Sequence, residues 1–232
     1  MIFWILLFIL VVLISFLLAY FSMRNFPQLP ALKESDYGLF LIRKTPKLTP
    51  QTLLDFHQMM KFRNFIISFE RLFKGTQSTL VIFAPRNLIQ NYQDQLDLVE
   101  LEDYTTDTTY EPYTFQMGVK QKGLKGDKLP FFSEFPILKE DELVFWQLIL
   151  KAKKDSGFEI LPRVAFFTKD KIRLMEITKS FQNLSGFLHK LPMPFSSEQM
   201  FKFYKARSFV KSEHNLNLSA AEVLNFILLK HS

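Results

Sequence analysis

Residues 64–84, NFIISFERLFKGTQSTLVIFA, contain two apolar runs separated by a short turn sequence. Both runs, 64–73 and 78–84, are rich in the β-branched and aromatic residues that favour strands. Gly75 and Thr76 supply a turn between them, and Pro85 ends the second run because proline has no N–H to donate to a strand ladder. This stretch therefore predicts two consecutive antiparallel strands.

The segments on either side of this hairpin add one strand and one helix each. Upstream, 37–43 is a β-rich run, and 49–61 opens with a Thr-Pro pair, which is typical of an N-cap followed by proline at the first helical position. Downstream, 86–96 carries apolar residues on one helical face, and 97–104 alternates apolar and acidic residues, which indicates a strand with one solvated face.

The resulting order over residues 37–112 is strand, helix, strand, strand, helix, strand. That order is typical of the split βαβ, or ferredoxin-like, unit, in which two helices cover one face of an antiparallel sheet. We therefore expect the fold class to be α+β.

A second, less regular α+β unit of similar type is expected over residues 113–232. Its pattern is eroded: a basic loop over 121–136 follows the first strand, and residues 198–212 are ambiguous between helix and strand. Ser219 and Glu222 form a capping box that opens a final helix. The other expected elements are strands at 113–120, 142–151 and 158–168, the last interrupted by Pro162, and a helix at 169–185.

An apolar run, IFWILLFILVVLISFLLAYF, occupies residues 2–21. About 20 apolar residues at 1.5 Å each span a hydrocarbon core of about 30 Å, so we expect a transmembrane anchor over 1–23. Trp4 and Tyr20 lie near its two ends and, with Arg24, are the candidate membrane-interface residues. Residues 24–36 contain two prolines and are expected to be an extended tether.

The alternative for this run is a cleaved signal peptide. No charge precedes the apolar core and Ala19-Tyr20-Phe21 is a poor cleavage site, so a retained anchor is favoured. Lys and Arg residues follow the run and none precedes it, which predicts a single-pass protein of the cytoplasmic (inner) membrane with its C-terminal domain in the cytoplasm. The chain has no cysteine, so a disulfide framework and a thiolate metal site are excluded.

The charge of the chain is unevenly distributed. Residues 24–119 carry 10 basic and 11 acidic side chains, whereas residues 120–211 carry 18 basic and 10 acidic ones. A basic second half would suit anionic lipid head groups or nucleic acid, although dispersed lysines on a solvated surface explain it as well. The most distinctive stretch is MFKFYKARSFVK, residues 200–211.

In that stretch aromatic residues alternate with cations, a combination that can stack bases and neutralise phosphates. The alternative is that the aromatics face the core while the cations face water. The candidate contacts to nucleic acid or lipid are Lys202, Phe203, Tyr204, Lys205, Arg207 and Lys211.

No catalytic, metal or cofactor site is predicted. A G-x-x-x-x-G-K-[ST] phosphate loop is missing, and the nearest approach, Gly123, Gly126 and Lys128, has the wrong spacing. The four histidines form no H-x-x-x-H pair. Acidic residues between Glu100 and Glu111 could hold a divalent cation, but a solvated strand face accounts for them. We expect a protein that is not an enzyme.

Several segments resemble the membrane-proximal α/β domain of type IV secretion or conjugation-like ATPases, the FtsK/HerA-type motors of candidate phyla radiation bacteria. The resemblance rests on a basic-Pro element after the first strand, on Pro85-Arg86, and on the closing Glu-Asp-Tyr-Thr. The quoted peptides are LFLIRKTPKLTPQTLLDFHQMM (39–60), ISFERLFKGTQSTLVIFAPRNLIQNYQDQL (67–96), VELEDYT (99–105) and FKFYKARSFVKSEHNLNLSAAEVLNFI (201–227).

The resemblance implies a bacterial, membrane-anchored, non-catalytic docking subunit of a type IV secretion- or DNA-transfer-like assembly. In that family a motor domain follows the closing segment, so the expected partner is a motor ATPase, or another secretion-complex subunit, encoded as a separate polypeptide. The lipid bilayer, DNA and a second copy of the chain are further expected partners. The alternative function is a membrane-tethered nucleic-acid-binding module that uses the basic second half.

Overall fold

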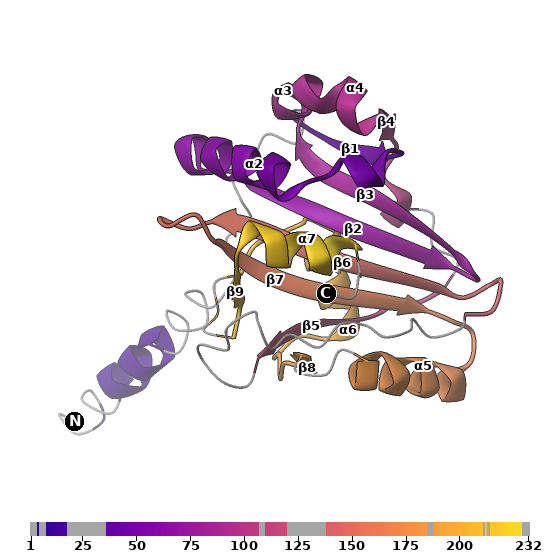
Figure 1. The fold of residues 1–232 in the computed structure, drawn as a ribbon. Coiled ribbons are helices and arrows are strands. Elements are labelled where there is room, and N and C mark those ends of the chain that lie inside the picture. The colour runs from indigo at the N-terminus through magenta and orange to yellow at the C-terminus, as the bar shows by residue number, and fades with distance from the viewer. Residues whose placement is uncertain are drawn as a thin grey trace.

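The computed structural model describes residues 4, 8–17, 36–106, 110–119, 138–184, 188–210, 212 and 214–228. Its main body is one antiparallel sheet of nine strands with helices on both faces (Figure 1). The α+β class is confirmed. The order of elements predicted from residue 37 to residue 101 is also found.

The expected transmembrane helix is wrong. Among the residues that the structure describes, none of the helices combines the length and the apolar character needed to cross a membrane. The predicted single-pass topology and inner-membrane location are wrong on the same finding. Trp4 is helical and exposed, whereas Tyr20, Arg24 and the tether 24–36 lie outside the described residues.

The first unit has the sheet order β4–β1–β3–β2, with every neighbouring pair antiparallel. Thr49 caps the first long helix by accepting a hydrogen bond from the Thr52 amide at 3.2 Å. The expected helix over 86–96 is three short turns instead. The elements are β1 (Tyr37–Ile42), α2 (Pro50–Arg63), β2 (Ile66–Lys74), β3 (Gln77–Pro85), α3 (Arg86–Ile89), η3 (Gln90–Tyr92), α4 (Gln93–Leu96) and β4 (Leu98–Leu101), with the 3-10 turns η2 (Thr45–Lys47) and η4 (Tyr104–Thr106).

The second unit extends the same sheet in the order β6–β7–β5–β8. It joins the first unit through β2 and β6, which pair antiparallel over nine residues from Ile66–Lys151 to Lys74–Leu143. Two short strands, β8 and β9, were not predicted, and the basic loop 121–136 lies outside the described residues. The elements are β5 (Tyr113–Val119), β6 (Leu143–Ala152), β7 (Phe158–Phe167), α5 (Lys171–Leu184), β8 (Leu188–Lys190), α6 (Ser197–Lys205), β9 (Leu216–Leu218) and α7 (Ala220–Leu228).

Pro162 does not interrupt β7. It lies opposite Leu148 of β6, and on its other side β5 pairs only from Arg163 onward while β9 pairs only up to Ile160. On that edge of β7, Pro162 therefore falls in the gap between the segment paired with β9 and the segment paired with β5. No N–H donor is required in that gap.

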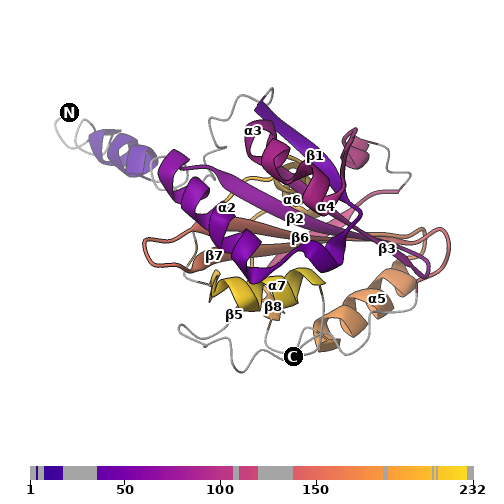
Figure 2. The same cartoon turned by 45° about the horizontal axis from the view of Figure 1, so that its top comes forward.

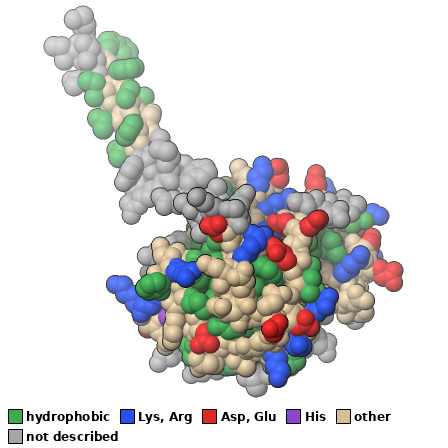
Figure 3. All heavy atoms as spheres, turned by 90° about the horizontal axis from the view of Figure 1, so that it is seen from above, with side chains coloured by type: hydrophobic (Ala, Val, Ile, Leu, Met, Phe, Trp, Pro, Cys, Tyr) green, Lys and Arg blue, Asp and Glu red, His purple; other side chains and the backbone are tan. Residues whose placement is uncertain are grey.

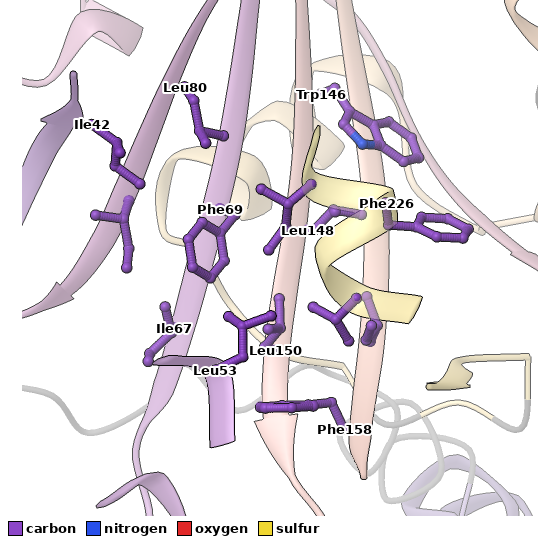
Figure 4. Close-up of a cluster of buried hydrophobic side chains, with 14 of the residues drawn as sticks. Ile42, Leu53, Ile67, Phe69, Leu80, Trp146, Leu148, Leu150, Phe158 and Phe226 are labelled. Carbon is purple, nitrogen blue, oxygen red and sulfur yellow. The ribbon is translucent and has the colours of Figure 1, made fainter. Parts of the chain in front are cut away.

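The main core lies between the sheet and helices α2, α5 and α7 (Figure 2). Phe69, Leu148 and Phe226 come together there from β2, β6 and α7 (Figure 4). Arg71 of β2 donates to the carbonyl of Leu228 at 2.9 Å, which satisfies a terminal carbonyl of α7. Helix α6 covers the opposite face of the sheet, and that face carries the site described next.

Candidate functional site

Four polar residues form a row across the sheet on the face beneath α6. Glu70 of β2 pairs with Gln147 of β6, Gln147 pairs with Arg163 of β7, and Arg163 pairs with Gln116 of β5. All four side chains are completely buried. Because a strand alternates its side chains, this register places them together on one face, between two small apolar clusters. They are the main polar groups in an otherwise apolar layer.

The carboxylate of Glu70 is surrounded by hydrogen-bond donors. Ser68 Oγ and Gln147 Nε2 each donate to its Oε1 at 2.9 Å, and the hydroxyl of Tyr104 donates to its Oε2. Arg207 donates from Nε to Oε1 at 3.1 Å and from Nη2 to Oε2 at 3.3 Å. A buried carboxylate is tolerated only when it is paired and hydrogen-bonded, and Glu70 meets both conditions.

Arg207 joins this buried carboxylate to the surface. It follows α6 and has a φ of 46°, a left-handed conformation that is uncommon for a residue with a side chain. Its Nη1 donates to Oδ2 of Asp103 at 2.5 Å, and Asp103 has a side chain that is 40% exposed. The same Nη1 donates to the carbonyl of Lys205 at 2.9 Å. The strained backbone is therefore held by ion pairs to two different segments of the first unit.

The electrostatics follow from burial and from these pairs. Burial alone would raise the pKa of Asp103, but the hydrogen bonds and charge of Arg207 outweigh it, and the pKa lies below its ordinary value. Burial raises the pKa of both Tyr104 and Tyr204 well above the ordinary value, and the negative charge of Glu70 adds to the increase. Both phenols therefore remain neutral donors, and their oxygens lie 2.9 Å apart.

Arg163, the third residue of the row, lies under the C-terminus of α6. Its Nη1 donates to the carbonyl of Phe203 at 2.9 Å, and Gln147 donates to the carbonyl of Tyr204 at 3.0 Å. Carbonyls at a helix C-terminus carry partial negative charge, so they suit a cation. Complete burial nevertheless lowers the pKa of Arg163. In the described chain, its Nε and Nη2 and both amide atoms of Gln116 have no hydrogen-bond partner.

This arrangement has a structural role: it holds the segment around Arg207 against the first unit. Glu70 is held by four side chains and has no exposed surface, so a substrate cannot reach its carboxylate. The network ties α6 and the residues after it to β2 in the first unit. We call this set, Glu70, Asp103, Tyr104, Gln147, Tyr204 and Arg207, the buried latch.

The predicted recognition residues are divided between the surface and the latch. Phe203 is half-buried against Phe195, with ring centroids 5.0 Å apart, and Tyr204 and Arg207 are buried members of the latch. Lys202 is exposed and pairs with Glu198 at 3.1 Å, and Lys205 lies over the Phe201 ring at 5.0 Å. Lys211 lies outside the described residues. The stretch is a helix, α6, followed by a turn.

The acidic residues and two of the histidines considered in the sequence show no arrangement for a metal within the described residues. Glu100 pairs with Arg86 at 2.6 Å, and the described residues hold no cluster of three or more His, Asp or Glu side chains arranged for a metal. His57 is buried against Phe158, and Nδ1 of His214 lies 3.0 Å from the carbonyl of Val119. Gly123, Gly126 and Lys128 lie outside the described residues.

Sequence reasoning missed Glu70, Arg163 and the two glutamines of the row. The available signal was a charge inside an apolar strand, as in ISFERLF and LPRVAFF, because ionisable residues are rarely buried without a partner. The partner, Arg207, lies 137 residues from Glu70, and no local pattern connects them.

A scan against models of known protein families gives no match for this chain, and a search of curated proteins gives none either. The resemblance to type IV secretion ATPases therefore stays a prediction.

Proposed function

We propose that this chain is a non-catalytic docking subunit of a type IV secretion- or DNA-transfer-like assembly, working with a separate motor ATPase. The sequence resemblance supports the choice of assembly. The structural support is a pair of exposed apolar side chains on α5, Ile172 and Met175, which are 70% and 71% exposed.

Helix α5 is amphipathic, but Ile172 and Met175 are not on its packed side. Ile177 and Phe181 are buried, and the Phe181 ring contacts Trp146 and Phe166 of the sheet at centroid distances of 5.4 and 5.5 Å. Ile172 and Met175 are three residues apart, so they lie on one face of the helix. That face points to solvent.

The helix that carries this pair is fixed to the sheet. Arg173 donates from Nε to Oε1 of Glu142 at 2.8 Å, and Glu142, just before β6, is buried. Burial alone would raise the pKa of Glu142, but the Arg173 hydrogen bond and charge lower it below its ordinary value. A rigid support reduces the entropy lost on binding, and exposed Lys171, Glu176 and Lys179 supply a polar rim.

The test is affinity capture of the tagged chain from its native cells, with bound proteins identified by mass spectrometry. We expect a phosphate-loop motor ATPase to be recovered in amounts comparable with the tagged chain. The double variant Ile172→Ser, Met175→Ser should lower that recovery at least tenfold, because central apolar side chains account for most of the energy of an interface.

The matched control is Lys171→Ser, Lys179→Ser on the same helix, which should leave recovery within about twofold because rim charges contribute little. Failure to recover any motor ATPase would argue against the proposed assembly. Recovery that is equally reduced by both double variants would show that α5 acts through its charge, not through this apolar pair.

A further inference from the structure

A basic surface lies at the end of the sheet where the two units join, outside the latch and away from α5. Helix α2 ends at Arg63, Asn64 turns the chain with a φ of 51°, and β2 begins at Ile66. Ile66 pairs with Lys151 near the end of β6, so the β6–β7 turn lies beside the end of α2. In Figure 3, blue side chains stand at the left-hand end of the body, the side on which α2 ends in Figure 1, and further blue side chains lie elsewhere along its edge.

Between the two segments is a shallow hollow of about 100 Å³. Its lining contains four lysines and neither an aspartate nor a glutamate: Lys61 from α2, Lys151 from β6, and Lys153 and Lys154 from the turn after β6. The Nζ of Lys151 lies over the Phe209 ring, 5.6 Å from its centroid, so the cations available at the hollow are the other three. Lys61 Nζ donates to the carbonyl of Lys154 at 2.7 Å, which fixes the two lysine-bearing segments side by side.

Much of this positive charge is not neutralised within the protein. In the described part of the chain, Lys153 has an acidic partner, Asp155, at 3.4 Å, whereas Lys61, Arg63 and Lys154 have none within 4.0 Å. Several cations held together without counter-charges produce a positive potential that attracts an anionic partner.

An aromatic ring stands beside these cations. Phe62 lies between Lys61 and Arg63 in the sequence and is 89% exposed, the highest exposure of any large apolar side chain in the described residues. The neighbouring aromatic Phe65 is buried in the core. Because Phe62 has almost no packing contacts, the fold does not account for an aromatic residue at this position.

We infer that this surface, Lys61, Phe62, Arg63, Lys153 and Lys154, binds single-stranded nucleic acid. The cations would neutralise successive phosphates and the Phe62 ring would stack on an unpaired base, which is how single strands are bound without sequence preference. A duplex would keep its bases inaccessible to Phe62, and an acidic peptide would leave the exposed ring unused. The inference is independent of the docking proposal, because α5 contributes no residue to this surface.

The test is fluorescence anisotropy of a labelled 20-nucleotide oligothymidine with the purified full-length chain. Contacts to three to five phosphates predict a slope of log affinity against log salt of roughly −2 to −3.5, that is, about 20- to 100-fold weaker binding at 200 mM than at 50 mM salt. A duplex of the same length should bind more weakly than the single strand.

Two variants separate the ring from the charges. Phe62→Ala should weaken binding about tenfold while leaving the salt slope unchanged, because stacking releases no counterions. Lys153→Glu, Lys154→Glu should weaken binding and lower the magnitude of the slope. Ile172→Ala is the matched control for loss of an exposed apolar side chain, and Lys171→Glu, Lys179→Glu is the control for loss of positive charge elsewhere.

Since Phe62, Lys153 and Lys154 are at the surface, unchanged circular dichroism and urea midpoints should accompany these effects. The inference would be overturned by lack of binding at 50 mM salt, or by a Phe62→Ala variant that binds like the parent chain. It would also be overturned if polyglutamate of equal charge displaced the oligonucleotide at equal concentration, because that result would assign the surface to an acidic protein.

Discussion

Replacing Arg207 tests whether the buried latch holds the second unit to the first. In Arg207→Met the carboxylate of Glu70 stays fully buried but loses two hydrogen bonds, at 3.1 and 3.3 Å, and its counter-charge. Removing one partner of a buried ion pair costs about 3–5 kcal/mol, mainly because the other charge is left uncompensated. We expect the free energy of unfolding from urea titration to fall by that amount, with an unchanged m value.

The surface pair Arg86–Glu100 provides the control. Its atoms are closer, at 2.6 Å, but its side chains are 44% and 49% exposed, so Arg86→Met should cost no more than about 1 kcal/mol. The double variant Glu70→Gln, Arg207→Met should recover part of the loss, since it leaves no buried charge at position 70 and the new amide oxygen can still accept from Ser68 and Gln147. The reasoning is refuted if Arg207→Met and Arg86→Met have the same effect, or if the double variant is less stable than Arg207→Met.

Two further predictions concern Asp103 and Gly118. The folded pKa of Asp103 lies below its ordinary value of 3.8, so its stabilising contribution is complete above that pH and is lost as the pH falls through the lower folded value. Asp103→Asn should therefore reduce the fall in urea midpoint between pH 5 and pH 2.5, and an unaltered fall would contradict this assignment. In Gly118→Ala, the new Cβ would lie 2.6 Å from the His214 carbonyl oxygen and 2.9 Å from Leu191, so stability should decrease by about 1–3 kcal/mol. Gly157→Ala, whose nearest contact would be 3.2 Å, is the control and should change the urea midpoint much less.

The local elements of the first unit could be predicted because their signals are short-range. Thr49 and Pro50 mark the start of α2, and the hairpin of β2 and β3 turns at Gly75, which has a φ of 54°. The edge-to-edge joining of β2 and β6 could not be predicted. Both strands are buried on both faces for most of their length, and such a strand does not indicate from its sequence which strand it pairs with.

The buried latch and the exposed Phe62 also depend on long-range packing, so the sequence could not predict them. The sequence pointed to Arg207 as a surface cation, but its partner Glu70 and its left-handed backbone become visible only when α6 is placed on the sheet. The exposed position of Phe62 follows from the orientation of α2, whose opposite face carries Phe56 and Met60 into the core. Functional surfaces of this kind depend on which side of an element faces outward, and a weakly amphipathic helix does not specify that side clearly.

Helix α7 shows how the two units depend on each other. Read outward from their junction, the orders β2–β3–β1–β4 and β6–β7–β5–β8 match strand for strand, which gives the sheet a pseudo-two-fold axis between β2 and β6. Under this symmetry, a helix of one unit that contacts the junction strand of the other unit, β2 or β6, should have a counterpart that makes the reverse contact. Helix α2 contacts β6, and α7 contacts both β2 and α2, so α7 takes the place corresponding to α2 although it comes from the C-terminal end of the second unit (Figure 1).

The physical reason is that this face of the sheet must be covered. Leu148 and Trp146 of β6 are buried on it, and an apolar face left in water would cost on the order of 25 cal/mol for each Å² exposed. Val223, Phe226 and Ile227 of α7 supply the cover, and Arg71 of the first unit satisfies the carbonyls at the end of α7. The C-terminal helix is therefore part of the shared core, and the latch on the opposite face fastens the segment that leads to it. Both faces of the junction are consequently closed by residues that follow α5, which makes the two units one cooperative structure.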